Sequence, residues 1–338
     1  MNFIKKIITL LSVIIVSFVA YVVFFFPPEI LERFTVSDSI RTVSEATNKL
    51  PLREYCIKSS HNTVLTDKNT IDVNNIKLIL SKGCRFLDFE IFLIDNGAYV
   101  ASSTDSSFAT VTSKNYIPLN DVLKHVIMHG FSAPSPNSND PLFINFRIKT
   151  KSTLLYNMIG MAVSKYLSSY LVNTKVTGDT KLDTLMEKII LIVDTSMSPS
   201  YANIEYYPKC NIEQQTTSAS SDKSKCYNLA KFVNMESGTS VLRLYKYDSI
   251  LRQSTNPPMI TDSDKPDTDV SLLRLVEPES SINLGNPDAL YLMLNYGVQF
   301  IPNRFYINDS NNKQYNAIFA KHKAAFVPFI DIIHSTST

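Results

Sequence analysis

From residue 52 onward, short apolar runs alternate with helical stretches, and this alternation limits the folds that are open to the chain. Every run is rich in Ile, Val, Phe and Leu, as are parallel strands that are covered on both faces. The runs lie at 55–58, 85–94, 99–101, 141–148, 188–193, 241–245, 297–301 and 325–329. The helical stretches lie at 73–81, 119–129, 154–171 and 181–186. About eight strands in alternation with helices predict an α/β fold, a TIM-type (β/α)8 barrel.

A second feature is the uncharged run over residues 7–26, IITLLSVIIVSFVAYVVFFF. As a helix, a run of this length rises by about 1.5 Å per residue and spans about 30 Å, the thickness of the hydrocarbon core of a bilayer. The run therefore predicts one transmembrane helix, between a short tail at 1–6 and a stem at 27–50. A cleaved signal peptide and a buried core helix are the alternatives, although a signal peptide has only about 7–15 apolar residues.

The charges beside this run predict its orientation. Lys5 and Lys6 precede it, together with the terminal amine, and Arg33 and Arg41 follow it. Positive charge collects on the cytosolic side of membrane helices. We therefore expect a single-pass membrane protein whose N-terminus is cytosolic and whose main domain is lumenal or extracellular.

Composition excludes several classes of function. The chain has 33 basic and 31 acidic residues, so its net charge is only +2 and we expect no nucleic-acid partner. Glycine is scarce, at 8 of 338 residues, and the absence of a GxGxxG or Walker pattern argues against a glycine-rich phosphate loop. The 4 cysteines are too few for a disulfide scaffold and lack the spacing of a zinc site.

Two short segments carry side chains that are suited to catalysis. His61 follows the first strand-like run, where barrel enzymes place their active sites, so it is a candidate acid, base or phosphate donor. The alternative is a structural histidine. Asp88 and Glu90 alternate with apolar residues, so both face one side of a strand. Two carboxylates in a barrel mouth need a cation such as calcium, and the alternatives are a solvated strand face or salt bridges to lysines.

The sequence IKSSHNT at 57–63 and the motif GCR at 83–85, followed by Asp88 and Glu90, form a specific pair of motifs. Weaker segments follow in order at 121–123, 141–146, 188–192, 242–245, 295–300 and 326–327. Together they resemble the X and Y catalytic regions of eukaryotic-type phosphoinositide-specific phospholipase C, in diverged form.

This resemblance implies a domain organisation and a reaction. It predicts an X-like half barrel at 51–197, a linker at 198–228 and a Y-like half barrel at 229–334. In the family, the inositol 2-hydroxyl attacks the phosphodiester of an inositol phospholipid, which yields diacylglycerol and an inositol phosphate. The family uses two catalytic histidines and one calcium ion for this reaction.

The resemblance also implies roles for individual residues. His61 stands at the first catalytic histidine of the family. Arg243 and Tyr245 match the pair that holds and stacks the inositol ring. The positions that match calcium ligands are Asn62, Asp88 and Glu90.

Three departures from the family pattern change this expectation. The segment at 99–103 has no histidine at the place of the second catalytic one. Ile192 and Asp194 stand where the family has two phosphate-binding lysines. Arg147 stands at the fourth calcium ligand, so the site either holds calcium or is metal-free. In a metal-free site, Arg147 either only neutralises the carboxylates or acts as a catalytic cation on the phosphate, as an arginine does in metal-independent bacterial relatives.

The resulting prediction is a membrane-anchored, phosphatidylinositol-specific phospholipase C-like phosphodiesterase. Its partners would be the membrane and an inositol phospholipid, and its activity would be impaired by the missing histidine. The alternative is a catalytically inactive barrel that binds inositol lipid or a protein at a membrane.

Overall fold

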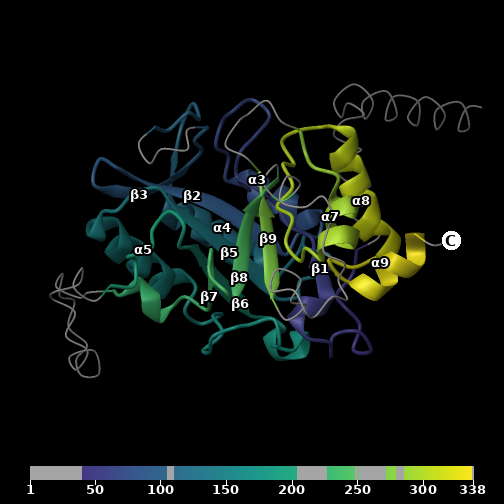
Figure 1. The fold of residues 1–338 in the computed structure, drawn as a ribbon. Helices are drawn as coiled ribbons and strands as arrows, with labels where there is room; N and C mark the ends of the chain where they lie inside the picture. Colours follow the sequence, from purple (N-terminus) through teal and green to yellow (C-terminus); the bar gives the residue numbers. More distant parts are fainter. Residues whose placement is uncertain are drawn as a thin grey trace, which may run out of the picture. The chain divides into compact units, whose positions relative to one another are not determined.

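The computed structural model describes residues 40–104, 110–203, 227–247, 250, 272–278 and 285–336. They belong to one unit, Ile40–Thr338, which is drawn in Figure 1. The predicted transmembrane run at 7–26 and residues 204–226 of the predicted linker lie outside the described residues. None of the helices in the described ranges combines the length and the apolar character that crossing a bilayer requires.

Strands and helices alternate along most of this unit (Figure 1). The strands are β1 (Tyr55–Ile57), β2 (Phe86–Ile94), β3 (Gly97–Ala101), β4 (Ile117–Pro118), β5 (Leu142–Ile148), β6 (Ile189–Asp194), β7 (Met235–Ser237), β8 (Leu242–Lys246), β9 (Leu273–Glu277) and β10 (Phe326–Pro328). The α-helices are α3 (Asn74–Ser81), α4 (Leu119–Gly130), α5 (Thr153–Tyr166), α7 (Ala289–Tyr296), α8 (Ser310–His322) and α9 (Phe329–Thr336). Short 3-10 turns lie at η2 (Leu52–Glu54), η3 (Leu182–Leu185) and η6 (Leu229–Lys231).

The sheet closes into a TIM-barrel-like ring of parallel strands. Its strand order is β4-β3-β2-β5-β6-β7-β8-β9, and the pairs from β2 to β9 are parallel. The segment around Phe300 lies between β9 and β1, because Phe300 forms parallel bridges to Leu275 and to Ile57. A parallel bridge between Ser59 and Phe86 then joins β1 to β2. The predicted α/β class and barrel-like architecture are therefore present in the described residues.

Several predicted elements differ from the structure in type or place. The run at 99–101 is part of β3, which forms an antiparallel hairpin with β2 and is not one of the parallel strands of the barrel. The run at 325–329 holds β10, which pairs antiparallel with β1. The stretch at 181–186 holds only the 3-10 turn η3. Strands β7 and β9 and helices α7, α8 and α9 were not predicted, because they are short or lie in polar sequence.

Helices α7 and α8 show how cap residues specify helices that were not predicted. Each begins at an aspartate whose side chain accepts a hydrogen bond from a backbone N–H of the first turn, Asp288 from Tyr291 and Asp309 from Asn312. Helix α7 ends at Gly297, whose φ of 55° lies in the left-handed region that glycine adopts without strain. Cap residues therefore define these helices more clearly than apolar periodicity does.

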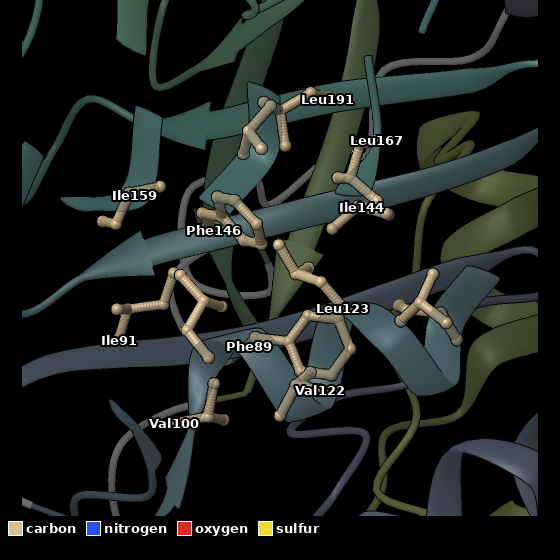
Figure 2. Close-up of a cluster of buried hydrophobic side chains, with 14 of the residues drawn as sticks. Phe89, Ile91, Val100, Val122, Leu123, Ile144, Phe146, Ile159, Leu167 and Leu191 are labelled. Carbon is tan, nitrogen blue, oxygen red and sulfur yellow. The ribbon is translucent and has the colours of Figure 1, made fainter. Parts of the chain in front are cut away.

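Successive side chains along each barrel strand point alternately into the lumen and to the outer face. On the outer face of β2, β5 and β6, a cluster of apolar residues packs against α4 and α5 (Figure 2). Its members include Phe89, Ile91, Ile144, Phe146, Leu191, Val122, Leu123 and Ile159. The lumen holds a second apolar cluster, which includes Phe86, Phe143, Ile190, Leu242, Leu273 and Phe300. Beyond this cluster, toward the carboxyl ends of the strands, the lumen-facing residues become polar, and these ends form a polar barrel mouth.

Candidate active site

A guanidinium lies at the centre of the polar residues at the barrel mouth. Arg147 is on β5 in register with Glu90 on β2, and Asp88 is in register with Asn145. Arg147 Nε lies 2.9 Å from Asp88 Oδ1, and Nη2 lies 2.6 Å from Asp88 Oδ2. Arg147 Nη1 lies 2.6 Å from Glu90 Oε1. The three side chains are buried, so the site contains a buried bidentate ion pair and a second buried ion pair.

The loop after β1 brings two further predicted residues to the same guanidinium. Arg147 Nη2 lies 2.6 Å from Asn62 Oδ1 and 3.1 Å from His61 Nε2. The backbone N–H of Asn62 donates to Asp88 Oδ2 at 2.9 Å, and Asn62 has a φ of 41°, which asparagine tolerates. Thr63 Oγ1 accepts from the backbone N–H of Asp88 at 2.9 Å. The SSHNT segment is thus tied to β2 at both its backbone and its side chains.

These contacts determine the protonation state of His61. A guanidinium has only donors, so His61 Nε2 next to Arg147 Nη2 carries no hydrogen. The ring proton is therefore on Nδ1, which lies 2.9 Å from Tyr306 Oη and donates to it. Burial, together with the positive charge of Arg147, lowers the pKa of His61 well below its ordinary value. His61 is a neutral imidazole with its unprotonated nitrogen on the guanidinium, which is the form that a general base requires.

Lys149 is a site residue that the sequence analysis did not identify. It follows β5 on the same face as Arg147, and its side chain is 2% exposed. Its Nζ lies 3.3 Å from Glu90 Oε1, the oxygen that also binds Arg147 Nη1. Burial lowers the pKa of Lys149 below its ordinary value, although Glu90 opposes this shift. The pattern of alternating charges Arg147 and Lys149 at the end of an apolar strand was a signal that could have identified it.

A second group of polar residues continues around the barrel mouth from Asn145. Asn145 Nδ2 lies 3.0 Å from Asp88 Oδ1 and 3.3 Å from Glu277 Oε1 on β9. Lys246 on β8 lies 3.0 Å from Glu277 Oε2. Burial opposes the charge of Glu277, but Lys246 and Arg147 lower its pKa below the ordinary value. Glu277 was not predicted as a site residue, because none of the predicted strands includes it.

Two predicted substrate-binding residues are not part of this cluster. On β8, Leu242, Leu244 and Lys246 face the lumen, so alternation turns Arg243 and Tyr245 to the outer face. Tyr245 packs against the apolar cluster of α7, α8 and α9. The structure therefore does not bring Arg243 and Tyr245 together with His61 and Arg147. The motif LRLYK matches the family by sequence, but its lumen-facing charged residue is Lys246.

The positions predicted to bind calcium do not fit that ion as they are arranged here. Asn62 Oδ1 and three carboxylate oxygens of Asp88 and Glu90 accept from Arg147 at 2.6–2.9 Å. The other oxygen of Glu90 accepts from the backbone N–H of Ser103 at 2.6 Å. A calcium ion would need the same oxygens and would be repelled by the guanidinium. In the part of the chain that the structure describes, no group of three or more His, Cys, Asp or Glu side chains is placed to hold a metal ion.

The charge of Arg147 is strongly stabilised in this setting. Burial opposes that charge, but the carboxylates of Asp88, Glu90 and Glu277 raise the pKa of Arg147 well above its ordinary value. The site thus holds a permanent cation at the place of the fourth calcium ligand, next to a neutral imidazole. This arrangement can bind a phosphate oxygen and accept a proton at adjacent atoms.

Comparison with known proteins finds one family model and several similar folds. The family model of the phosphatidylinositol-specific phospholipase C X domain matches residues 48–194. The fold is similar to the crystal structure of L. pealei PLC21, with a TM-score of 0.60 and 15% identity over 83% of this chain and 37% of that one. S. officinalis PLC21 gives a TM-score of 0.58 and 14% identity over 83% and 37% of the two chains. The chain thus spans less than half the length of these two proteins.

A bacterial structure is also similar, at a lower score. It is a calcium-dependent phosphoinositol-specific phospholipase C from a Gram-negative bacterium, Pseudomonas sp., with a TM-score of 0.48 and 10% identity over 85% of this chain and 98% of that one. No curated protein sequence matches this chain. From the X-domain match over residues 48–194 and the barrel-like fold, we conclude that this chain resembles the phosphatidylinositol-specific phospholipase C family in diverged form.

Proposed function

We propose that the chain is a membrane-anchored phosphodiesterase that cleaves inositol phospholipids to diacylglycerol and an inositol phosphate, with Arg147 as the phosphate-binding cation. The observation that carries this proposal is the 3.1 Å contact between the unprotonated His61 Nε2 and Arg147 Nη2. It places a general base next to a guanidinium in a buried site. Such a site needs both groups, because the attacking hydroxyl loses a proton while negative charge develops on the phosphate.

Substrate binding would release the base from the guanidinium. Arg147 Nη2 has two hydrogens but three acceptors within reach, and the contact with His61 is the longest of the three. A phosphate oxygen that binds Nη2 would displace this weakest contact. His61 Nε2 would then be free to accept the proton of the attacking hydroxyl as the new bond to phosphorus forms.

Lys149 is the group that would supply the second proton. His61 lies at the Nη2 end of the guanidinium, and Lys149, through Glu90, lies at the Nη1 end. In-line displacement at phosphorus places the attacking and leaving oxygens on opposite sides, so the two groups have suitable positions for base and acid. When the bond from phosphorus to the glycerol oxygen breaks, that oxygen would take a proton from the Lys149 ammonium. This role replaces that of the histidine missing from 99–103.

The membrane setting of the proposal rests on the sequence. The uncharged run at 7–26 would anchor the chain, with the barrel on the lumenal or extracellular side. A second candidate function is an inactive barrel that binds inositol lipid or a protein. The neutralisation of Arg147 by Asp88 and Glu90 favours it, because a phosphate must compete with two carboxylates.

Hydrolysis by the full chain in detergent micelles tests the proposal. We expect phosphatidylinositol to be cleaved equally with added calcium and with chelator, because Arg147 supplies the cation. The variant His61→Ala should lose about 10²–10⁴-fold of the rate, as expected for removal of a general base. His334→Ala, which changes an exposed histidine on α9, is the matched control. No cleavage by the wild type would favour the inactive barrel, and cleavage that requires calcium would overturn the role of Arg147.

The role of Lys149 is tested in the same assay with two substrates. Lys149→Arg keeps the positive charge beside Glu90 but does not release a proton near neutral pH. We expect it to slow cleavage of phosphatidylinositol by about 10²-fold or more and to spare a nitrophenyl inositol phosphate, whose leaving group needs no proton. An equal loss on both substrates would show that Lys149 only positions Glu90.

A further inference from the structure

One motif of the sequence has no part in the proposed reaction. Asn308, Asp309 and Ser310 form an N-x-S sequence, and the chain contains no other N-x-S or N-x-T sequence. This is the acceptor sequence for N-linked glycosylation, which is found in surface loops of proteins that enter the secretory pathway. Because so short a motif also arises by chance, its surroundings in the structure decide whether it can be modified.

Both side chains that the modification needs lie at the surface. Asn308 is exposed in the loop that precedes α8, and Ser310, the first residue of α8, is exposed as well. The buried residues of α8 begin at Asn312. A transferase could therefore reach the Asn308 amide and the Ser310 hydroxyl together in the folded protein.

The middle residue of the motif holds this loop in place. Asp309 Oδ1 accepts from the backbone N–H of Asn312 at 2.7 Å and so caps α8. Asp309 Oδ2 accepts from the backbone N–H of Asn286 at 2.7 Å. On the other side of Asn308, the carbonyl oxygen of Ile307 accepts from Asn312 Nδ2 at 2.8 Å. The neighbours of Asn308 are thus fixed by contacts that do not involve its side chain, so a group attached to its amide breaks none of them.

The proposed orientation places the motif on the side of the membrane where it can be modified. The charges beside the uncharged run at 7–26 predict a cytosolic N-terminus and a lumenal or extracellular domain. N-linked glycans are added to chains on the lumenal side of the endoplasmic reticulum membrane. A cytosolic domain would never meet the transferase, so the motif and the orientation can be tested together.

We propose that Asn308 is an N-glycosylation site, at which the chain carries its one N-linked glycan. The donor is an oligosaccharide linked to a lipid through a pyrophosphate. A bond forms between Asn308 Nδ2 and the anomeric carbon of the donor, and the bond from that carbon to the pyrophosphate oxygen breaks. The lipid pyrophosphate leaves, and the nitrogen gives up one proton. This inference rests on the orientation stated in the proposed function but not on the cleavage of a lipid.

Cell-free translation of the full chain with endoplasmic reticulum microsomes tests the site. We expect the wild type to shift to lower electrophoretic mobility, and peptide N-glycosidase should reverse the shift and convert Asn308 to aspartate, which mass spectrometry detects. Asn308→Gln and Ser310→Ala should lose the shift completely. Ser310→Thr is the matched control and should keep it, because threonine supplies the same hydroxyl.

A second acceptor separates the site from the orientation. Lys175→Thr turns the exposed residues 173–175 into an N-x-T sequence. A glycan on Asn173 of this variant but none on Asn308 would overturn the site and support the lumenal domain. The absence of a glycan at both positions would overturn the site together with the orientation. Cleavage of phosphatidylinositol is measured separately in detergent micelles, so its absence would overturn the phosphodiesterase and leave the glycan as evidence for the site.

Discussion

The two sides of the barrel mouth differ in whether their buried polar atoms have hydrogen-bond partners within the protein. On the side of β2 and β5, Arg147 joins Asp88, Glu90 and Asn62 at 2.6–2.9 Å, and opposite charges are paired. On the side of β6 and β7, Asp194 and Ser237 each have a buried atom without a partner, and Asp194 lies near a second carboxylate. Both sides are equally remote from solvent, so burial does not explain the difference.

This difference distinguishes polar residues that stabilise the fold from polar residues that are suited to binding a ligand. A paired cluster stabilises the fold only while it is complete, because removal of one member leaves buried charge uncompensated. Unpaired atoms reduce stability in the absence of a ligand and are retained where they contribute to binding. We therefore expect equivalent substitutions on the two sides to change the free energy of unfolding in opposite directions.

The largest effect should come from Arg147→Met. Asp88 and Glu90 would remain buried without their cation, so the free energy of unfolding should fall by about 3–5 kcal/mol. Urea denaturation measures this loss by circular dichroism, because the chain has no tryptophan for fluorescence. Adding Asp88→Asn and Glu90→Gln to Arg147→Met should recover part of it.

An exposed ion pair provides the control for Arg147. Arg53 pairs with Asp179, whose side chain is 74% exposed, so Arg53→Met should cost no more than about 1 kcal/mol. A loss below about 1 kcal/mol for Arg147→Met as well would show that the paired side does not stabilise the fold.

The paired side is also the side that could be predicted from sequence. His61, Asn62, Asp88 and Glu90 lie in two local motifs, and period-two alternation places both carboxylates on one face. Arg147 could be assigned to the same place from the family pattern. The structure brings all five together, although the sequence alone could not decide between calcium and a salt-bridged cluster.

The unpaired side could not be predicted, for physical reasons. Strand β7 has only three residues, Met235–Ser237, and β9 has only five, Leu273–Glu277, so both are too short for a clear periodic signal. The roles of Asp194 and Glu277 depend on a register between strands that are far apart in the chain. The position of Tyr245 on the outer face of β8 could not be predicted for the same reason, because a match to a sequence motif does not determine which face of a strand a residue occupies.

A second prediction compares the same substitution on the two sides. Burial and Glu277 raise the pKa of Asp194 from 3.8 to about 6, so the folded state binds more protons than the unfolded state between these values. The wild type therefore loses stability as pH rises through this window, and Asp194→Asn does not. Above pH 7, Asp194→Asn should be more stable than the wild type by on the order of 3 kcal/mol, and near pH 4 the gap should close.

Asp88→Asn is the matched control, because it breaks the pair with Arg147. It should destabilise the fold at pH 7, where Asp194→Asn stabilises it. Urea denaturation at pH 4 and pH 7.5 measures both variants. The same sign for both at pH 7.5 would contradict the distinction between the two sides.

The smallest effect tests the edge of the paired side, where Tyr306 Oη lies 2.9 Å from His61 Nδ1. Tyr306→Phe removes the acceptor of the Nδ1 proton, so the free energy of unfolding should fall by about 1 kcal/mol. The tautomer should not change, because the Arg147 guanidinium next to Nε2 still excludes a proton there, and ¹⁵N chemical shifts of His61 should show the proton on Nδ1 in both proteins. Tyr291→Phe on α7, where the side chain is 40% exposed, is the control. A shift of the proton to Nε2 in Tyr306→Phe would contradict the assignment of Nε2 as the unprotonated nitrogen, because a guanidinium offers no acceptor to a proton on Nε2.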